Sequence, residues 1–182
     1  MDDRQLKKFS KYLSRHLRHD PGRIGLVLDE GGWADIDALL AACRRAGVRI
    51  GREQLAEVVE RNDKRRFAVD PTGSRIRASQ GHSIRVDLGL APVVPPAWLF
   101  HGTVAGSLGG IRAEGLRPMS RQHVHLSPDR ETAARVGARW GRPVVLSVDA
   151  GAMHTAGHPF WRSDNGVWLT AAVPAGFVRF PG

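Results

Sequence analysis

Arg66-Phe67-Ala68-Val69 and Arg75-Ile76-Arg77-Ala78 are two short segments that flank the tetrapeptide Asp70-Pro71-Thr72-Gly73. Proline and glycine at neighbouring positions are typical of a tight turn, because proline presets φ and glycine accepts positive φ. The stretch 66–78 therefore predicts a β-hairpin. The meaning of this hairpin depends on the segments that precede it.

Three helices are predicted before the hairpin. The first is basic and amphipathic, its apolar positions recur at helical spacing, and it stops at 20–22; these positions are Leu6, Phe9, Leu13 and Leu17. The second is expected to begin at an Asp35 N-cap and to end at Gly47, and the third covers residues 52–61. Three short helices followed by a hairpin is the order of a winged-helix lobe.

The segment 87–96 cannot continue a helix, because each of its three prolines removes a backbone donor and restricts the preceding residue. We therefore predict a first lobe over 1–88, a Pro-rich linker over 89–96 and a second lobe over 97–182. Beyond the linker, strands are expected over 98–100, 124–126, 144–148, 167–170 and 177–180, and helices over 107–114 and 129–139. The fold class predicted for the whole chain is α+β.

Charge points to a polyanionic partner. The 182 residues carry 27 Lys+Arg against 18 Asp+Glu, a net charge of +9, and 42% hydrophobic content is typical of a globular protein with a core. Nucleic acid, acidic membrane and phosphorylated cofactors all fit this charge, and so does a purely compositional bias towards arginine.

Cysteine content and the N-terminus predict the compartment. The single Cys43 cannot form an internal disulfide and lies in an apolar-periodic run, where a buried structural thiol is expected. Residues 1–5 lack the apolar region of a signal peptide, and no run of 18 apolar residues follows. We expect a reducing, cytoplasmic location without export or membrane insertion.

Arg18-His19 places a fixed cation beside the side chain that titrates near neutrality, at the end of a basic helix. Such a pair can hold a phosphate and move a proton. The alternative is a histidine that caps the last carbonyls of its helix beside a solvated arginine. Arg66 leads directly into the hairpin, and the charged run before it could equally be a solvated turn.

Two further segments could bind a ligand. Phe100-His101-Gly102-Thr103 is predicted at the end of a strand, where glycine would let a ligand approach the backbone. Alternation around Val124 and Leu126 puts His123, His125 and Ser127 on one face of a strand. His-x-His also suggests a metal, but no further ligand is grouped with the pair, so we expect no metal.

The stretch 163–170 combines a turn with an aromatic strand. It could be a hairpin leading into the core, or Trp168 could stack on a nicotinamide or a base. The chain has no Gly-rich dinucleotide fingerprint after a strand, no phosphate-binding P-loop and no G-x-S-x-G elbow. A Rossmann dehydrogenase and the common NTPase and hydrolase classes are therefore disfavoured.

Taken together, five segments in order resemble the RNA 2′-phosphotransferase family (Tpt1/KptA). They are Ser10-Lys11-Tyr12-Leu13-Ser14 with Leu17-Arg18-His19, Asn62-Asp63-Lys64-Arg65-Arg66-Phe67, His101-Gly102-Thr103, Arg121 with His123-Val124-His125-Leu126-Ser127, and Ser163-x-Asn165-Gly166-Val167-Trp168-Leu169. Arg65 stands where the family pattern Lys-Gln-Arg-Phe has Gln, which leaves open whether Arg65 or Arg66 is the functional guanidinium.

The resemblance implies a winged-helix lobe, a second lobe similar to ADP-ribosyltransferases, and a two-step reaction. An internal RNA 2′-phosphate attacks C1″ of the NAD⁺ ribose and expels nicotinamide. The ribose 2″-OH then attacks phosphorus, which releases RNA 2′-OH and ADP-ribose 1″,2″-cyclic phosphate. NAD⁺ is consumed as a co-substrate and no metal is expected.

The resemblance also implies the residues. The expected catalytic residues, in a cleft between the lobes, are Arg18, His19, Arg66 and Arg121. The expected NAD⁺ contacts are His101, Gly102, Thr103, His125, Ser127, Asn165 and Gly166. The expected RNA contacts are Lys11, Ser14 and Lys64. His19 would act as general acid/base, a role that suits the ordinary imidazole pKa near 6.5.

Two other functions are compatible with the sequence. An ADP-ribosyltransferase that stops after the first step, on a nucleic-acid phosphate end or a protein, would need the same pocket but not His19. A winged-helix regulator would read duplex DNA through its third helix, without needing the second lobe. We expect a monomer whose RNA substrate carries an internal 2′-phosphate, as in a tRNA.

Overall fold

The chain has a mixed α/β fold with small sheets. A computed structural model describes residues 1–62 and 64–181; Asp63, which belongs to the segment 62–67 considered above, and Gly182 lie outside the described residues. Within that range the strands form three antiparallel three-stranded sheets. The chain divides into two compact units, Met1–Gly89 and Leu90–Gly182. The linker and the roles expected for the two lobes stay predictions.

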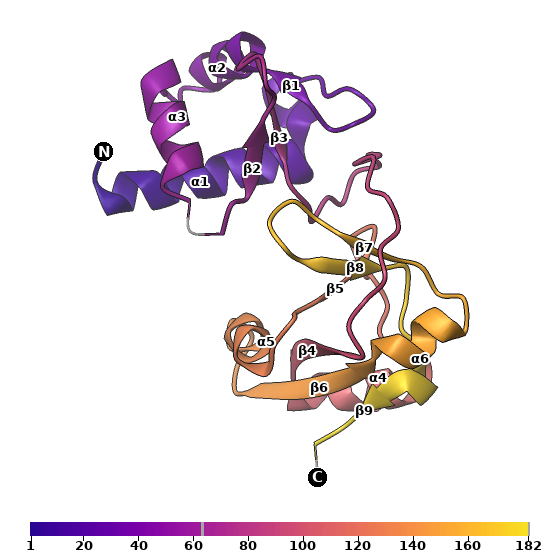
Figure 1. The fold of residues 1–182 in the computed structure, drawn as a ribbon. Helices are drawn as coiled ribbons and strands as arrows, with labels where there is room; N and C mark the ends of the chain where they lie inside the picture. The colour runs from indigo at the N-terminus through magenta and orange to yellow at the C-terminus, as the bar shows by residue number, and fades with distance from the viewer. Residues whose placement is uncertain (63, 182) are drawn as a thin grey trace. The chain divides into compact units, whose positions relative to one another are not determined.

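The first unit consists of helices followed by a hairpin (Figure 1). In order, its elements are α1 (Asp3–Arg18), a 3₁₀ turn (Pro21–Ile24), β1 (Ala34–Asp35), α2 (Ile36–Arg45), α3 (Arg52–Glu60), β2 (Phe67–Val69) and β3 (Arg75–Ala78). The Asp35 carboxylate caps α2 by accepting from the Ala38 N–H at 2.8 Å, and Gly47 has φ +78° after the helix ends. The three helices and the hairpin are confirmed. β1, which pairs with β3, is too short to leave a sequence signal.

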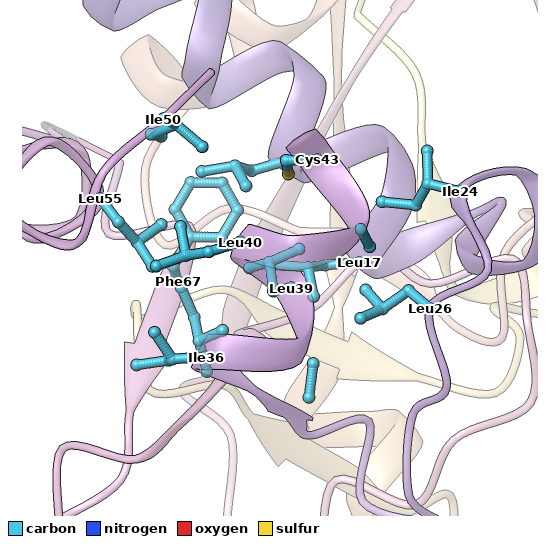
Figure 2. Packing of buried hydrophobic residues seen from close by; sticks show 14 of the residues in the cluster. Leu17, Ile24, Leu26, Ile36, Leu39, Leu40, Cys43, Ile50, Leu55 and Phe67 are labelled. Atoms are coloured by element: carbon cyan, nitrogen blue, oxygen red, sulfur yellow. The ribbon is translucent and has the colours of Figure 1, made fainter. Parts of the chain in front are cut away.

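The core of the first unit brings α1, α2, α3 and β2 together (Figure 2). Leu17 from α1, Leu39 from α2 and Phe67 from β2 are all buried. Cys43 is fully buried among them, and burial raises the pKa of its thiol. The expectation of a buried structural thiol is confirmed, because a raised pKa keeps the sulfur in its unreactive protonated form.

The second unit alternates strands with short helices (Figure 1). In order, these are β4 (Trp98–Val104), a 3₁₀ turn (Ala105–Ser107), α4 (Leu108–Glu114), β5 (Val124–Leu126), α5 (Arg130–Gly137), β6 (Pro143–Asp149), α6 (Ala150–Thr155), β7 (Phe160–Arg162), β8 (Trp168–Thr170), a 3₁₀ turn (Ala175–Phe177) and β9 (Val178–Arg179). Its two sheets have the strand orders β4-β6-β9 and β5-β8-β7.

The bounds of two predicted strands in the second unit need correction, and two short elements were not predicted. β4 continues to Val104, so His101, Gly102 and Thr103 lie within a strand rather than at its end. The strand expected over 177–180 shrinks to Val178–Arg179. Neither α6 nor β7 was expected, because six and three residues are too few to reveal a period. Among the helices of the described residues, none has the length and apolar character needed to cross a membrane.

Candidate functional site

Arg18 and His19 occupy the C-terminal end of α1. Arg18 is the last helical residue and is half-buried, with its Nε and Nη2 atoms shielded from solvent. His19 is the C-cap residue: its backbone N–H donates to the Arg15 carbonyl at 2.9 Å, and its side chain is exposed. The backbone of His19 thus closes the last turn of α1.

The His19 ring is held by a residue far away in the sequence. Its Nδ1 lies 2.9 Å from the Ser83 hydroxyl. The Ser83 backbone N–H donates to the Arg18 carbonyl at 3.0 Å. One residue thus contacts both members of the Arg18-His19 pair.

A second histidine, His82, is buried beside this pair. Its side chain is 2% exposed, and neither ring nitrogen has a hydrogen-bond partner among the described residues. Burial first, and then the charges of Arg18, His19 and Arg77, together lower the pKa of His82 to about 4. His82 is therefore neutral at pH 7, and the fixed cations beside it are not joined by another positive charge.

Arg66, rather than Arg65, turns towards α1. The Arg66 guanidinium donates to Asn62 Oδ1 at 3.2 Å, and its Nη1 lies 3.5 Å from the Ser10 hydroxyl on α1. Asn62 Nδ2 in turn donates to the same hydroxyl at 2.9 Å. Arg65 is exposed, with φ +40°. The geometry supports Arg66 as the positioned guanidinium of the two.

Two of the three residues predicted to contact RNA, Lys11 and Ser14, lie on α1. Ser10, Ser14 and Arg18 recur every four residues and therefore lie along one side of the helix. Lys11 is exposed beside them, and the Ser14 hydroxyl is buried without a hydrogen-bond partner among the described residues. Lys64 is exposed, and its backbone N–H donates to Asn62 Oδ1 at 3.2 Å.

In the second unit, β4 places His101 beside the end of β5. His101 Nδ1 lies 3.2 Å from the His125 carbonyl. Because a carbonyl only accepts, the proton of the ring is on Nδ1, and Nε2 is the acceptor of the neutral form. Burial lowers the pKa of His101 and Arg121 lowers it further, against the opposing effect of the bond to His125. A neutral His101 can accept from a ribose hydroxyl.

Arg121 is paired with His125. Arg121 Nη1 lies 2.5 Å from His125 Nδ1. A guanidinium only donates, so His125 Nδ1 is the acceptor in this contact. Desolvation and the charge of Arg139 lower the pKa of Arg121, which still starts far above neutrality. Arg121 remains a cation, oriented by its contact with His125.

Gly102 has a packing role that the sequence did not reveal. A Cβ built on Gly102 would lie 1.8 Å from the Ala133 carbonyl oxygen, so α5 approaches β4 where the side chain would be. Thr103, 8% exposed, is buried next to it. The glycine is explained by this helix–strand contact, while its predicted contact with NAD⁺ stays a prediction.

Ser127 and the turn Asn165-Gly166 meet at one end of a sheet. Ser127 exchanges both backbone hydrogen bonds with Phe100, at 2.7 and 2.9 Å, and so joins the end of β5 to β4. In the register of β5 and β8, Leu126 pairs with Trp168, which puts the β7–β8 turn near Ser127. Asn165 Oδ1 accepts from the Ser163 hydroxyl at 2.7 Å, and Gly166 has φ +81°.

Trp168 and the first histidine of the His-x-His pair both take part in packing within the second unit. Trp168 is 8% exposed and belongs to the core of the second unit, which supports the simple hairpin interpretation. His123 packs its ring 5.2 Å from that of Trp161. Within residues 1–62 and 64–181, no three His, Cys, Asp or Glu side chains are grouped as metal ligands would be.

The structure thus gathers the predicted residues within each unit. The first unit brings Arg18, His19 and Arg66 onto or against α1, and the second joins His101, Arg121, His125 and Ser127. A site between the lobes stays a prediction. Sequence reasoning missed Ser83, His82 and Ser10, whose roles come from contacts with residues distant in the chain.

Known proteins of one family match this chain along nearly its whole length. The family model described as RNA 2′-phosphotransferase, Tpt1/KptA family, matches residues 3–172. A protein of Streptomyces coelicolor named probable RNA 2′-phosphotransferase is 64% identical over 181 residues, which cover 100% of this chain and 98% of the relative. A protein of Pseudomonas aeruginosa with the same name is 55% identical, covering 98% of this chain and 99% of the relative.

Proposed function

Because the chain belongs to the RNA 2′-phosphotransferase (Tpt1/KptA) family, we propose that it removes an internal RNA 2′-phosphate in two NAD⁺-dependent steps. In the first, a 2′-phosphate oxygen bonds to C1″ of the ribose while the bond to nicotinamide breaks. In the second, the 2″-OH attacks phosphorus, the bond to the RNA 2′-oxygen breaks, and ADP-ribose 1″,2″-cyclic phosphate leaves.

The main support for this proposal is the arrangement of side chains at the C-terminal end of α1. Arg18 supplies a half-buried fixed cation, and beside it the imidazole of His19 is held through Nδ1 at 2.9 Å from Ser83. Phosphoryl transfer mainly needs positioning, charge neutralisation and a proton carrier. His19 would take the proton of the 2″-OH and return one to the RNA 2′-oxygen, without a metal.

The second unit fits a dinucleotide co-substrate. Neutral His101 offers an acceptor at Nε2 for a ribose hydroxyl, and Ser127 with Asn165-Gly166 offers further polar groups. Arg121, oriented by His125, would bind a phosphate oxygen through its guanidinium. We propose that this unit is similar to ADP-ribosyltransferases and that the first, with three helices before its hairpin, is a winged helix.

Stepwise assays with radiolabelled RNA test the proposal. Wild-type protein should remove the phosphate from a 2′-phosphorylated oligoribonucleotide only when NAD⁺ is present. His19→Ala or Arg66→Ala should accumulate 2′-phospho-ADP-ribosylated RNA, because the second step stalls. Arg121→Ala should suppress even that intermediate, while Arg142→Ala, which changes an exposed arginine outside the site, should behave as wild type.

The outcomes also separate the rival functions. If no variant accumulates the intermediate, the division of roles among these residues is wrong. Wild-type protein that makes the ADP-ribosylated RNA but never the cyclic phosphate would be an ADP-ribosyltransferase. Tight binding to duplex DNA without consumption of NAD⁺ would indicate a regulator instead.

A further inference from the structure

The segment 79–83 connects Arg66 with Arg18, the two arginines of the first unit that are expected to be catalytic. At its start, the Ser79 backbone N–H donates to the Arg66 carbonyl at 2.9 Å, and the Ser79 hydroxyl donates to the Arg65 carbonyl at 3.0 Å. At its end, the Ser83 N–H donates to the Arg18 carbonyl at 3.0 Å. His82, between them, is buried. The segment is therefore fixed at both ends and in the middle.

Ser83 presents its hydroxyl from this fixed backbone to His19 Nδ1 at 2.9 Å. A hydroxyl can accept from Nδ1–H or donate to bare Nδ1 by rotating about its C–O bond. The contact can thus persist whether the ring is an imidazolium or either neutral tautomer. It also brings no charge to a place where Arg18, Arg77 and His82 already interact.

We propose that Ser83 is the positioning residue for His19: it holds the ring by Nδ1, so that the ring exchanges its catalytic proton at Nε2. A proton carrier needs an orientation that survives its own change of protonation, and a hydroxyl anchored through its backbone meets that need. This role rests on the proposed function for its chemical consequence but not for its geometry.

The geometric part is tested on the ligand-free protein. Ser83→Ala removes the hydroxyl and keeps the backbone bond to Arg18, whereas Ser83→Thr keeps both. Carbon relaxation NMR of the His19 ring gives the order parameter of this side chain. In Ser83→Ala the order parameter should fall to that of a solvent-exposed imidazole, and in Ser83→Thr it should stay at the wild-type value. Ser74→Ala, a change in the hairpin turn of the same unit, is the matched control.

The chemical part is tested by single-turnover kinetics on 2′-phosphorylated RNA. Ser83→Ala should slow the second step about tenfold, the effect of losing a hydrogen bond worth about 1.4 kcal/mol. The first step and the KM for RNA should stay unchanged, because the phosphate contacts are intact. Ser83→Thr should restore the rate.

The two parts can fail separately. An unchanged order parameter of the His19 ring in Ser83→Ala overturns the positioning role, and so does a wild-type second-step rate in that variant. If wild-type protein consumes no 2′-phosphorylated RNA at all, the proposed function has failed, and the order parameter of the His19 ring alone then decides whether Ser83 holds His19.

Discussion

His82 shows how a single buried ring can set the pH range in which the first unit is stable. Both of its nitrogens are shielded from solvent and lack a hydrogen-bond partner among the described residues. Its folded-state pKa is lowered to about 4, first by burial and then by Arg18 and other neighbouring cations. The unfolded chain therefore binds more protons than the folded chain between about pH 6.5 and pH 4.

Stability of the first unit should fall as the pH is lowered through this window. A shift of about 2.5 pKa units corresponds to about 3 kcal/mol, lost between pH 6.5 and pH 4. His82→Leu should remove this fall in the free energy of unfolding, because a leucine side chain binds no proton. Amide hydrogen exchange at buried Leu39 and Ile76 measures the free energy of opening in this unit. Parallel pH profiles of wild type and variant would contradict the prediction.

Arg65 and Arg66 offer a matched pair for testing which guanidinium binds phosphate. Arg66 is held by Asn62 and lies near Ser10, whereas Arg65 is exposed. Arg66→Lys should lower kcat about a hundredfold, because an ammonium loses the planar two-point contact with phosphate oxygens. Arg65→Lys should stay within about threefold. Steady-state rates on the same RNA decide, and an equal loss in both variants would reject the assignment.

Packing of α5 on β4 requires the absence of a side chain. The Cβ of any larger residue at 102 would lie 1.8 Å from a backbone oxygen of α5. Likewise, a Cβ added to Gly137 on that helix would lie 3.0 Å from the carbonyl oxygen of Thr103. Two glycines thus allow the close approach of the helix and the strand that carries His101. The helix in turn fixes the strand.

Gly102→Ala should therefore destabilise the second unit, because it disturbs the packing of α5 on β4. Because the clash is with backbone rather than a flexible side chain, the loss should reach or exceed about 3 kcal/mol. Gly106→Ala is the control, since a Cβ there meets nothing within 4 Å. Urea denaturation followed by circular dichroism measures both variants. Similar midpoints for the two would show that α5 can shift away at little cost.

The charge of the whole molecule governs how it meets RNA. With a net charge of +9, the protein attracts a polyanion at long range, and each phosphate contact releases condensed counterions from the RNA. This attraction adds affinity without reading bases. The salt dependence of RNA binding therefore reports both the net charge of the surface and the number of phosphate contacts.

The KM for 2′-phosphorylated RNA should rise with NaCl concentration. Each RNA phosphate that the protein neutralises should add about 0.7 to the slope of log KM against log salt for a single strand, and Lys11→Ala, a change in an expected RNA contact, should lower the slope by about that amount. An uncharged osmolyte at equal osmolarity is the control and should have little effect. A slope near zero would show that the charge serves no role in binding RNA.

Local signals determined much of this protein from its sequence alone. The Asp35 cap, the positive φ of Gly47 and the Asp70-Pro71-Thr72-Gly73 turn each act within a few residues, so the helices and hairpin of the first unit could be predicted. The pair Arg18-His19 could be named for the same reason, since its members are adjacent.

Tertiary structure decided what no local pattern contains. Ser83 meets His19 across 64 residues, Gly102 is required by a backbone oxygen of α5, and Arg66 is distinguished from Arg65 by its contacts with α1 and Asn62. Such contacts depend on how the helices and strands pack. Packing brings together residues that are far apart in the chain, and the local sequence around one of them does not indicate the other. The sequence determined which groups could do the chemistry, and folding decided how each is held.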